Sequence, residues 1–572
     1  MTGEADRPTP GRTNPSFGWL HLLPPLSGLR LLCVDTHGGL TPTLARNCLE
    51  VVLLPDLSGN TAQVSDFSAA ETGAPVRRMT LVELSIEADR SNAQAALYDG
   101  LIVHDPEGFV VHGNSLVQLQ DLLRRALPTL RPEAFVYLGL RNAWSPRHLL
   151  RRLTSRTARR DSPLLSPLRM VRLLEKTSFS TLRVHPYLLQ DERVAEILPR
   201  TGFRSTKNRE LANERVKEKL LGSTGSRLFA PAYGIVAYRD SGKRSTLETL
   251  LKRLAILCGG DATRHPVMKQ FLVFAGHKAI VSIGPEETND GDLIVVMVAD
   301  ALSKARRRSE VTTLDQLARL PPAISTRVPR VLDQFEIDGT LCIVMDRLPG
   351  VTLDSEVPPL ETVTDAALDF LIELHAQTTV SLTVDDDAFQ TLFGHLIDAA
   401  CRRNEDLTED LQALVPVLRQ RLEGRRLPTV WFHGDYKVEN VMYSPDTLRV
   451  TGVIDWEHAT RPGLPLLDLH YLLIYNRTIR GMDWIDAVQQ LMLDARPTDR
   501  EQSRLLRYAQ VVGIEDALLP ALEAMFVVHQ IGCRLHLPAD LVLRRRVRSL
   551  LRAVADHCSI VRVHEHEASD GN

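Results

Sequence analysis

The sequence predicts an α/β region followed by a region of α+β character, in which strands precede helices. Up to about residue 240, short apolar runs alternate with helix-length segments, which is typical of a mainly parallel sheet. Beyond about residue 265, strand-like runs come first, and segments with apolar residues at spacings of three and four follow. We therefore expect a flexible leader over 1–28 and domains over 29–240, 245–350 and 351–560.

Length and composition agree with a globular protein of several domains. The chain has 572 residues, of which 44% are hydrophobic and 24% charged. This composition excludes collagen-like, wholly disordered and disulfide-scaffold classes. The formal net charge is -3, so the chain has no global attraction to nucleic acid or to an anionic membrane, and we expect neither partner.

The cysteines and the apolar runs predict a cytoplasmic protein. The seven cysteines are scattered and form no C-x-x-C pair, which suits a reducing compartment. The first 16 residues lack the basic start and apolar core of a secretion signal. No apolar run approaches the roughly 18–20 residues that a membrane-spanning helix needs.

The expected elements follow from these patterns in chain order. In the first region we expect strands at 31–34, 51–54, 101–103, 135–138, 182–184 and 233–238, helices at 116–126 and 164–174, and a linker at 239–242. In the second region we expect strands at 270–274, 279–283, 293–299 and 341–345, with a hairpin loop at 285–292, and helices at 366–375, 411–422 and 511–528.

The strongest chemical signal is an apolar strand that leads into His433-Gly434-Asp435 and, five residues later, Asn440. A second apolar strand then delivers Asp455. Phosphoryl transfer from ATP needs a carboxylate that orients the acceptor hydroxyl and accepts its proton, together with oxygen ligands for Mg²⁺. We assign Asp435 as the base and Asn440 and Asp455 as metal ligands. His433 is expected to brace the loop by hydrogen bonds.

This motif resembles that of the aminoglycoside phosphotransferase and choline kinase family, relatives of the protein kinases. The family pattern is HGDxxxxN followed by a hydrophobic residue and Asp-Trp-Glu. A P-x-x-D-L segment follows later in the family, and residues 465–469 match it. The resemblance covers about residues 265–560 and implies a bilobal protein-kinase-like fold that binds ATP in a cleft. It also implies that Lys437, two residues past the base, touches the transferred phosphate.

The same resemblance assigns nucleotide-binding residues to the small lobe. Glu310 matches the helix glutamate, and Asp346 lies in a segment similar to the hinge strand between the lobes. The family places a lysine on the strand at 293–299, where this sequence has Met297. Lys278, in the turn expected to lie over the phosphates, is the candidate substitute from a neighbouring strand.

The N-terminal region resembles the class I S-adenosylmethionine-dependent methyltransferases, which are Rossmann-like. A strand ends in Asp35, and a glycine turn with Gly39 opens a helix. Residues 98–105 and 130–142 are similar to the family's fourth and fifth strands, and 233–238 to its final reversed strand. The resemblance implies that Asp35 and Gly39 contact S-adenosylmethionine, although His37 replaces the first glycine of the D-x-G-x-G pattern.

These observations predict an enzyme that transfers the γ-phosphate of Mg²⁺-bound ATP to a hydroxyl group of a small molecule, fused to a methyltransferase-like domain. Two alternatives stay open. One is a catalytically impaired kinase-like protein that binds a nucleotide or a partner, which Met297 would explain. The other is a bifunctional methyltransferase and kinase. The motifs do not indicate the acceptor, because the loops of the large lobe select it.

Overall fold

The structure, a computed structural model, divides into two compact units, each described by itself below. The first contains Met1–Ala305 and Val331–Arg347, and the second contains Arg306–Arg330 and Leu348–Asn572. The residues that the structure describes are 17–35, 40–54, 76–80, 82–86, 97–105, 115–142, 167–175, 177, 179, 181–190, 193–197, 230, 232–239, 245–257, 267–274, 277–284, 292–353, 360–494, 497–533 and 541–560.

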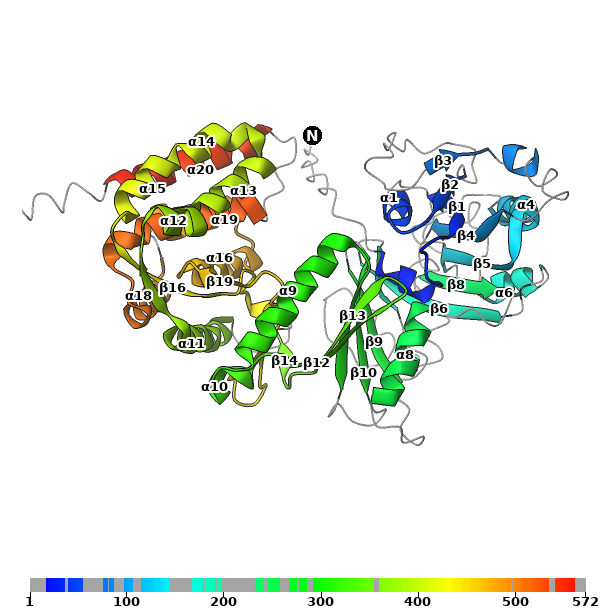
Figure 1. Ribbon diagram of the computed structural model, residues 1–572, viewed down its shortest axis with the longest axis horizontal. Helices are drawn as coiled ribbons and strands as arrows, with labels where there is room; N and C mark the ends of the chain where they lie inside the picture. The colour runs from blue at the N-terminus through cyan, green and yellow to red at the C-terminus, as the bar shows by residue number, and fades with distance from the viewer. Residues whose placement is uncertain are drawn as a thin grey trace, which may run out of the picture. The chain divides into compact units, whose positions relative to one another are not determined.

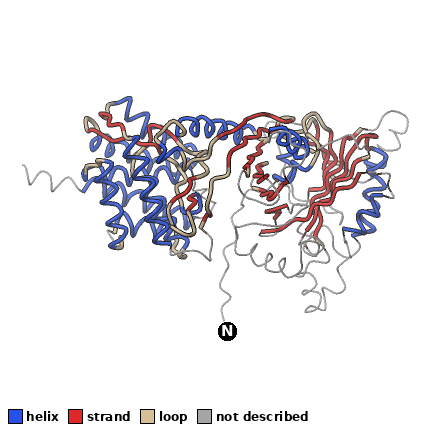
Figure 2. The backbone as a smooth tube through the Cα atoms, turned by 90° about the horizontal axis from the view of Figure 1, so that it is seen from below, coloured by secondary structure: helices blue, strands red, loops and turns tan. Residues whose placement is uncertain are grey.

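One thirteen-stranded sheet runs through the first unit, in the order β12-β13-β11-β10-β9-β7-β6-β8-β5-β4-β1-β2-β3 (Figure 1). Figure 2 shows its strands in red, side by side. The strands are β1 (Arg30–Asp35), β2 (Glu50–Leu53), β3 (Val76–Arg78), β4 (Tyr98–Asp105), β5 (Leu130–Arg141), β6 (Thr181–Gln190), β7 (Arg193–Ile197), β8 (Ala232–Tyr238), β9 (Val267–Val273), β10 (Lys278–Gly284), β11 (Leu293–Val298), β12 (Val331–Ile337) and β13 (Thr340–Asp346).

The N-terminal strands form the mainly parallel sheet that the sequence predicts. β1 pairs in parallel with β2 and β4, and β4 pairs in parallel with β5. β8 is antiparallel to both β5 and β6, which confirms the reversed strand expected at 233–238. The helices α1 (Leu40–Ala45), α4 (Ser115–Ala126) and α6 (Pro167–Glu175) belong to this part, and apolar residues of α4 and α6 share one buried cluster with the sheet.

The strands expected in the small lobe are also present, and they continue the same sheet. β9, β10, β11, β13 and β12 pair antiparallel in that order, which confirms the strand-rich character expected from about residue 265 onward. β7, a short strand that the sequence pattern missed, joins the two sets, since Ile197 pairs with Phe271 of β9. The expected domain boundary near residue 240 therefore does not separate two sheets. The described end of the expected linker, Arg239, is anchored by hydrogen bonds to carbonyls of residues 127–131.

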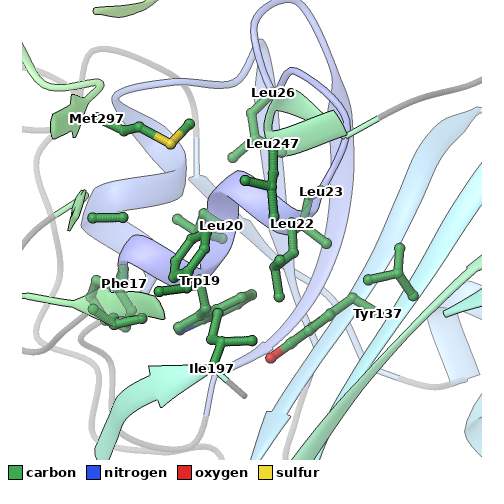
Figure 3. Close-up of a cluster of buried hydrophobic side chains, with 14 of the residues drawn as sticks. Phe17, Trp19, Leu20, Leu22, Leu23, Leu26, Tyr137, Ile197, Leu247 and Met297 are labelled. Carbon is green, nitrogen blue, oxygen red and sulfur yellow. The ribbon is translucent and has the colours of Figure 1, made fainter. Parts of the chain in front are cut away.

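The leader expected over 1–28 is wrong for residues 17–26, which are folded into the core of the first unit. The helical turn η1 (Gly18–Leu22) is fully buried, and Trp19 stacks against His104 and Tyr137 with ring centroids 4.3 and 4.4 Å away. The physical reason is the apolar run Phe-Gly-Trp-Leu-His-Leu-Leu, whose side chains gain more by burial than by exposure to water. Figure 3 shows these side chains gathered in one cluster.

Close packing fixes this segment against β10. A Cβ atom at Gly18 would lie 2.2 Å from the carbonyl oxygen of Lys278, so only glycine allows the approach. His21 stacks on His277, and its Nε2 donates to the carbonyl of His277 at 3.3 Å. The helix α8 (Thr246–Leu257) adds Leu247, Leu250 and Leu254 to the same cluster. The N-terminal segment is thus a part of the small-lobe core.

Met297 lies in this cluster with no exposed surface (Figure 3). It pairs with Ala279 on one side and Cys342 on the other, and all three belong to the cluster. Side chains alternate along a strand, so Val296 and Val298 face the opposite side of the sheet, and both are buried. The position to which the resemblance assigned a lysine is therefore a core position.

The second unit is mostly helical, as the sequence predicts. Its helices are α9 (Ala301–Leu317, from Arg306 onward), α10 (Pro322–Ser325), α11 (Leu360–Thr378), α12 (Asp386–Phe389), α13 (His395–Arg403), α14 (Thr408–Gln412), α15 (Leu414–Leu422), α16 (Leu467–Ile479), α17 (Trp484–Val488), α18 (Asp499–Val512), α19 (Leu519–Cys533) and α20 (Leu541–Ile560). Two small sheets complete it. One contains β14 (Val351–Thr352), β17 (Val441–Tyr443) and β18 (Val450–Val453), and the other β15 (Val380–Thr383), β16 (Arg426–Phe432) and β19 (Thr460–Gly463).

The continuous helix expected at 511–528 is wrong, because the segment contains the end of α18 and the start of α19. Gly513 follows α18 with φ of +77°, the left-handed conformation in which glycine commonly ends helices. No helix among the described residues is long and apolar enough to span a membrane.

A buried histidine connects three elements of the second unit. His375 of α11 donates through Nε2 to the carbonyl of Trp431 in β16 at 2.7 Å. Its Nδ1 accepts a hydrogen bond from the Tyr508 hydroxyl of α18 at 2.6 Å, and this hydroxyl also accepts from the backbone of Leu466. Burial lowers the pKa of His375 to about 3, and burial likewise lowers the pKa of His470 to about 3. Both imidazoles are neutral in the folded protein.

We expect Trp19→Ala to destabilise the first unit by about 3–5 kcal/mol, because it leaves a large cavity in a closed cluster. Denaturant unfolding, followed by circular dichroism, measures this loss. Leu49→Ala is the control, since Leu49 is 57% exposed and its truncation should change stability little. Equal midpoints for the two variants would show that residues 17–26 do not contribute to the core.

We expect the second unit to lose stability as the pH falls below about 6.5. The folded pKa of His375 and of His470 lies below the unfolded value, so acid protonates the unfolded chain first and favours it. Each histidine should contribute a slope of about 1.4 kcal/mol per pH unit, and no slope above pH ~7. Urea unfolding between about pH 7 and 5 measures the slope, and His375→Gln should make it shallower. An identical slope in the variant would contradict a neutral His375.

Candidate active site

The loop that follows β16 is held by one buried carboxylate. Asp468, in the first turn of α16, accepts hydrogen bonds from the backbone N–H of His433 at 2.7 Å and of Gly434 at 3.0 Å. Asp468 is only 2% exposed, so both bonds lie out of water, where charged hydrogen bonds are strongest. This contact gives a structural role to the aspartate of the P-x-x-D-L segment, to which the sequence assigned none.

Gly434 lets the loop turn between its two functional neighbours. Its φ is +81°, a conformation that side chains rarely adopt. A Cβ atom there would lie 2.7 Å from the carbonyl oxygen of His458. Both the dihedral angle and the close approach therefore require glycine between His433 and Asp435.

His433 braces the loop, as the sequence predicts. Its Nε2 donates to the carbonyl of Ile454 at 3.1 Å, and its Nδ1 accepts from the backbone N–H of Asp435 at 3.2 Å. Burial lowers the pKa of His433 to about 4, against the opposing effect of Asp435 and Asp455. The neutral ring thus fixes the loop to the end of β18 and has both nitrogen atoms engaged.

Asp435 lies between an amide and an ammonium group. The side-chain nitrogen of Asn440 donates to the Asp435 carboxylate at 3.0 Å and to its backbone carbonyl at 2.9 Å. Lys437 Nζ lies 3.6 Å from Asp435 Oδ2, and it also lies 5.3 Å from the centre of the Tyr475 ring. The contacts with Asn440 and Lys437 orient the Asp435 carboxylate. Asp435 is 7% exposed, so it lies at the edge of the buried loop.

Asn440 and Asp455 come from neighbouring strand ends. The backbone N–H of Ile454 donates to the carbonyl of Asn440 at 2.9 Å, and β17 pairs antiparallel with β18 directly beyond them. Because the Asn440 nitrogen bonds to Asp435, its amide oxygen is the atom that can bind a cation. Asp455 has φ of +69°, a conformation that side chains rarely adopt, and such residues are enriched at functional sites. An amide oxygen and a carboxylate suit Mg²⁺, which takes few protein ligands beside phosphates and water.

A buried arginine that the sequence analysis did not single out connects three carboxylates. Arg307 of α9 lies 2.5 Å from Glu310, 3.2 Å from Asp455 and 2.7 Å from Glu457. The other oxygen of Glu310 accepts from the backbone N–H of Trp456 at 3.1 Å. Glu310, the glutamate expected to hold a lysine, therefore pairs with an arginine three residues earlier on its own helix.

The charges around Arg307 explain its protonation. Burial alone would lower the pKa of Arg307, but Glu310, Asp455 and Glu457 outweigh it and raise the pKa, so the guanidinium stays charged. Burial raises the pKa of Glu310, against the attraction of Arg307. One cation thus serves three acids, and it fixes the orientation of Asp455.

A cavity of about 510 Å³ opens beside Asp435, within the second unit. Helix α13 and the end of α19 form one wall, the segment from His458 to Leu467 forms another, and Phe432, Gly434 and Asp435 form its inner end. This volume lies in the range of small-molecule sites. A small molecule in this cavity would lie beside Asp435.

The remaining predicted site residues lie in the first unit. Lys278 begins β10, and its Nζ lies 5.4 Å from the centre of the Phe274 ring. Asp346 ends β13, where it pairs with Leu293. Asp35 ends β1 opposite His104 of β4. Gly39 lies outside the described residues. The contacts of these four residues with a nucleotide or with S-adenosylmethionine stay predictions.

Arg307 and Asp468 had signals in the sequence. Arg307 precedes Glu310 by three residues, which puts both on one face of a helix. Asp468 belongs to the segment 465–469, which matches the family's P-x-x-D-L pattern. That pattern does not show that the Asp468 carboxylate binds the backbone of His433, 35 residues earlier.

Comparison with known proteins finds similar sequences for part of this chain. Residues 286–506 match the model of the phosphotransferase enzyme family. Streptomycin 3''-kinase of Streptomyces griseus is 27% identical over 189 residues, which are 30% of this chain and 66% of the kinase. Acyl-CoA dehydrogenase family member 11 of Homo sapiens is 30% identical over 157 residues, 24% of this chain. The match spans 19% of that human protein, and 15% of the related mouse family member 10.

The solved structures that align with parts of this chain include both types that the sequence resembles. An aminoglycoside phosphotransferase of Streptomyces rimosus, in complex with ADP and streptomycin, aligns with 50% of this chain and 98% of its own at 22% identity and a TM-score of 0.33. A SAM-dependent methyltransferase of Archaeoglobus fulgidus aligns with 37% of this chain and 86% of its own at 16% identity and a TM-score of 0.23. Residues 286–506, in the C-terminal half of the chain, are thus similar to the phosphotransferase enzyme family.

Proposed function

We propose that the C-terminal half transfers the γ-phosphate of ATP, with Mg²⁺, to a hydroxyl group of a small molecule. The observation that carries this proposal is the linked set of Asp435, Asn440 and Asp455. Asn440 bonds to Asp435, and the residue before Asp455 bonds to Asn440, so three oxygen-bearing side chains are fixed around one loop. Phosphoryl transfer depends mainly on such positioning and on charge.

In this proposal Asp435 orients the acceptor hydroxyl in the adjacent cavity and accepts its proton. A cation close to the transferred phosphate then offsets the negative charge of its oxygen atoms as the acceptor oxygen attacks. Lys437, whose ammonium lies 3.6 Å from Asp435, supplies this charge without leaving the loop. His433 has both nitrogen atoms in hydrogen bonds and serves as a positioning residue.

The Asn440 amide oxygen and the Asp455 carboxylate would hold Mg²⁺. When bound, this ion neutralises charge on the phosphates of the nucleotide. Arg307 positions Asp455 for this task through the 3.2 Å contact with Oδ1. Arg307 also pairs with Glu310. In the family that the sequence resembles, a strand lysine pairs with this glutamate, and here Met297 takes the place of that lysine.

The alternative of an impaired, nucleotide-binding protein rests on β11. Its described side chains are all apolar, and Met297 is in the core, so this strand supplies no cation. The two functions differ in one measurement. Binding of ATP without consumption of ATP, across a broad set of alcohols, would favour the impaired protein.

We expect Asp435→Asn to lower the turnover number roughly 10²–10⁴-fold, because the amide cannot accept the acceptor proton. Release of ADP from Mg²⁺-ATP in the presence of a set of alcohols measures the effect. Asp446→Asn is the matched control, since Asp446 lies exposed in the turn between β17 and β18 and should leave turnover unchanged. Full turnover in the Asp435 variant would remove it as the base.

We expect Arg307→Met to lower the free energy of unfolding by about 3–5 kcal/mol, because it leaves the buried Glu310 and the partly buried Asp455 and Glu457 without their cation. It should also raise the Mg²⁺ concentration needed for half-maximal turnover, since Asp455 loses its orientation. Arg308→Met, at an exposed position of the same helix, is the control. If the two variants unfold at the same urea concentration, Arg307 is not the cation that holds these acids.

A further inference from the structure

The cavity beside Asp435 is lined by an unusual set of charges. Arg306 of α9 and Arg403 of α13 both line it, and so do His395, His458 and His529. Among the described lining residues, Asp435 is the one acid. The ammonium of Lys437 lies 3.6 Å from this carboxylate and 3.7 Å from that of Glu439, which does not line the cavity, so two arginines stand against one lining acid. The balance of the described wall is therefore positive.

The two arginines differ from Arg307 and Arg419 of the same unit in their partners. Arg307 binds three carboxylates, and Arg419 forms an ion pair with Asp386. Arg306 and Arg403 form no ion pair with any residue that the structure describes, and both are exposed at the cavity. Their guanidinium groups are thus available to a bound anion, for which the planar arginine fork is well suited.

The cavity also has an apolar part beside the base. Phe432, Leu464 and Leu467 line it with little exposure to bulk water, so a carbon skeleton in the cavity would contact apolar residues there. A ligand that places a hydroxyl at Asp435 lies along this surface with its other end toward the basic residues. A polycationic ligand would instead meet two arginines, with one carboxylate that is already paired with Lys437.

We propose that the acceptor is a small alcohol that carries a negative charge, either a carboxylate or a phosphate, recognised by Arg306 and Arg403. This proposal rests on the proposed phosphotransferase function and adds the class of substrate. In it, Arg403 selects the acceptor through its charge and takes no part in proton transfer.

A matched set of six-carbon compounds tests the charge preference on the full chain. Glucose is neutral, glucosamine is cationic, and gluconate and glucose 6-phosphate are anionic at similar size, while streptomycin represents a large polycation. Calorimetric binding to the protein with ADP and Mg²⁺ should rank at least one anionic compound at least tenfold above glucose and above both cations. Gluconate and glucose 6-phosphate distinguish the carboxylate from the phosphate. The phosphorylated product should form at Asp435-dependent rates with the preferred compound.

Charge reversal at Arg403 provides the site-specific test. Arg403→Glu should weaken binding of the preferred anion at least tenfold and raise its KM with a smaller effect on kcat. Arg402→Glu makes the same change at the adjacent exposed position, which does not line the cavity, and should leave binding unchanged. Unfolding midpoints of both variants show whether the fold is intact, and Arg403→Lys should restore part of the affinity.

The outcomes separate the two proposals. Equal or tighter binding of glucosamine or streptomycin, no binding of either anion, or equal effects at positions 402 and 403 would overturn the anionic acceptor. Anion binding that depends on Arg403, but with no transfer from ATP to any compound, would support the site and overturn the phosphotransferase function. Asp435-dependent transfer of phosphate to a neutral or cationic alcohol would support the phosphotransferase function and overturn the anionic acceptor.

Discussion

The candidate active site depends on one buried carboxylate. Asp468 binds the backbone of His433 and Gly434, and so sets the direction in which the chain leaves β16. From that point His433 reaches the end of β18, and Asn440 reaches back to Asp435. Because each bond fixes the next residue, the loop has little freedom, and its functional oxygens are preorganised at the cost of a buried charge.

Arg307 plays a comparable part for Asp455, which we propose as a metal ligand. It brings Glu310, Asp455 and Glu457 around one guanidinium group, so the helix α9 and the segment after β18 are held by a single cation. A buried charge cluster of this kind is stable only when every member has a partner. The basic cavity beside Asp435 shows the opposite arrangement, since Arg306 and Arg403 have no acidic partner among the described residues and face space that a ligand can fill.

The first unit explains why position 297, where the resemblance places a lysine, holds a methionine. Residues 17–26 and α8 cover the face of the sheet that contains Met297, and they turn this position into core. The sequence pattern marked the leader as flexible to residue 28, because a short apolar run without periodicity does not show what it packs against. In the same way, β7 is too short to be recognised from its pattern, yet its pairing with β9 makes one sheet of two expected domains.

The sequence by itself determined the mainly parallel strands of the first region, the strands followed by helices of the second region, the reversed strand β8, and the motif that carries His433, Asp435, Asn440 and Asp455. These are local features, set by apolar periodicity and by residue spacing. Only the tertiary structure decided that Arg307 pairs with Glu310, that Asp468 holds the loop, that Met297 is buried and that the cavity wall is basic. Each of these depends on contacts between residues far apart in the chain or on the direction of a side chain, which local periodicity does not encode.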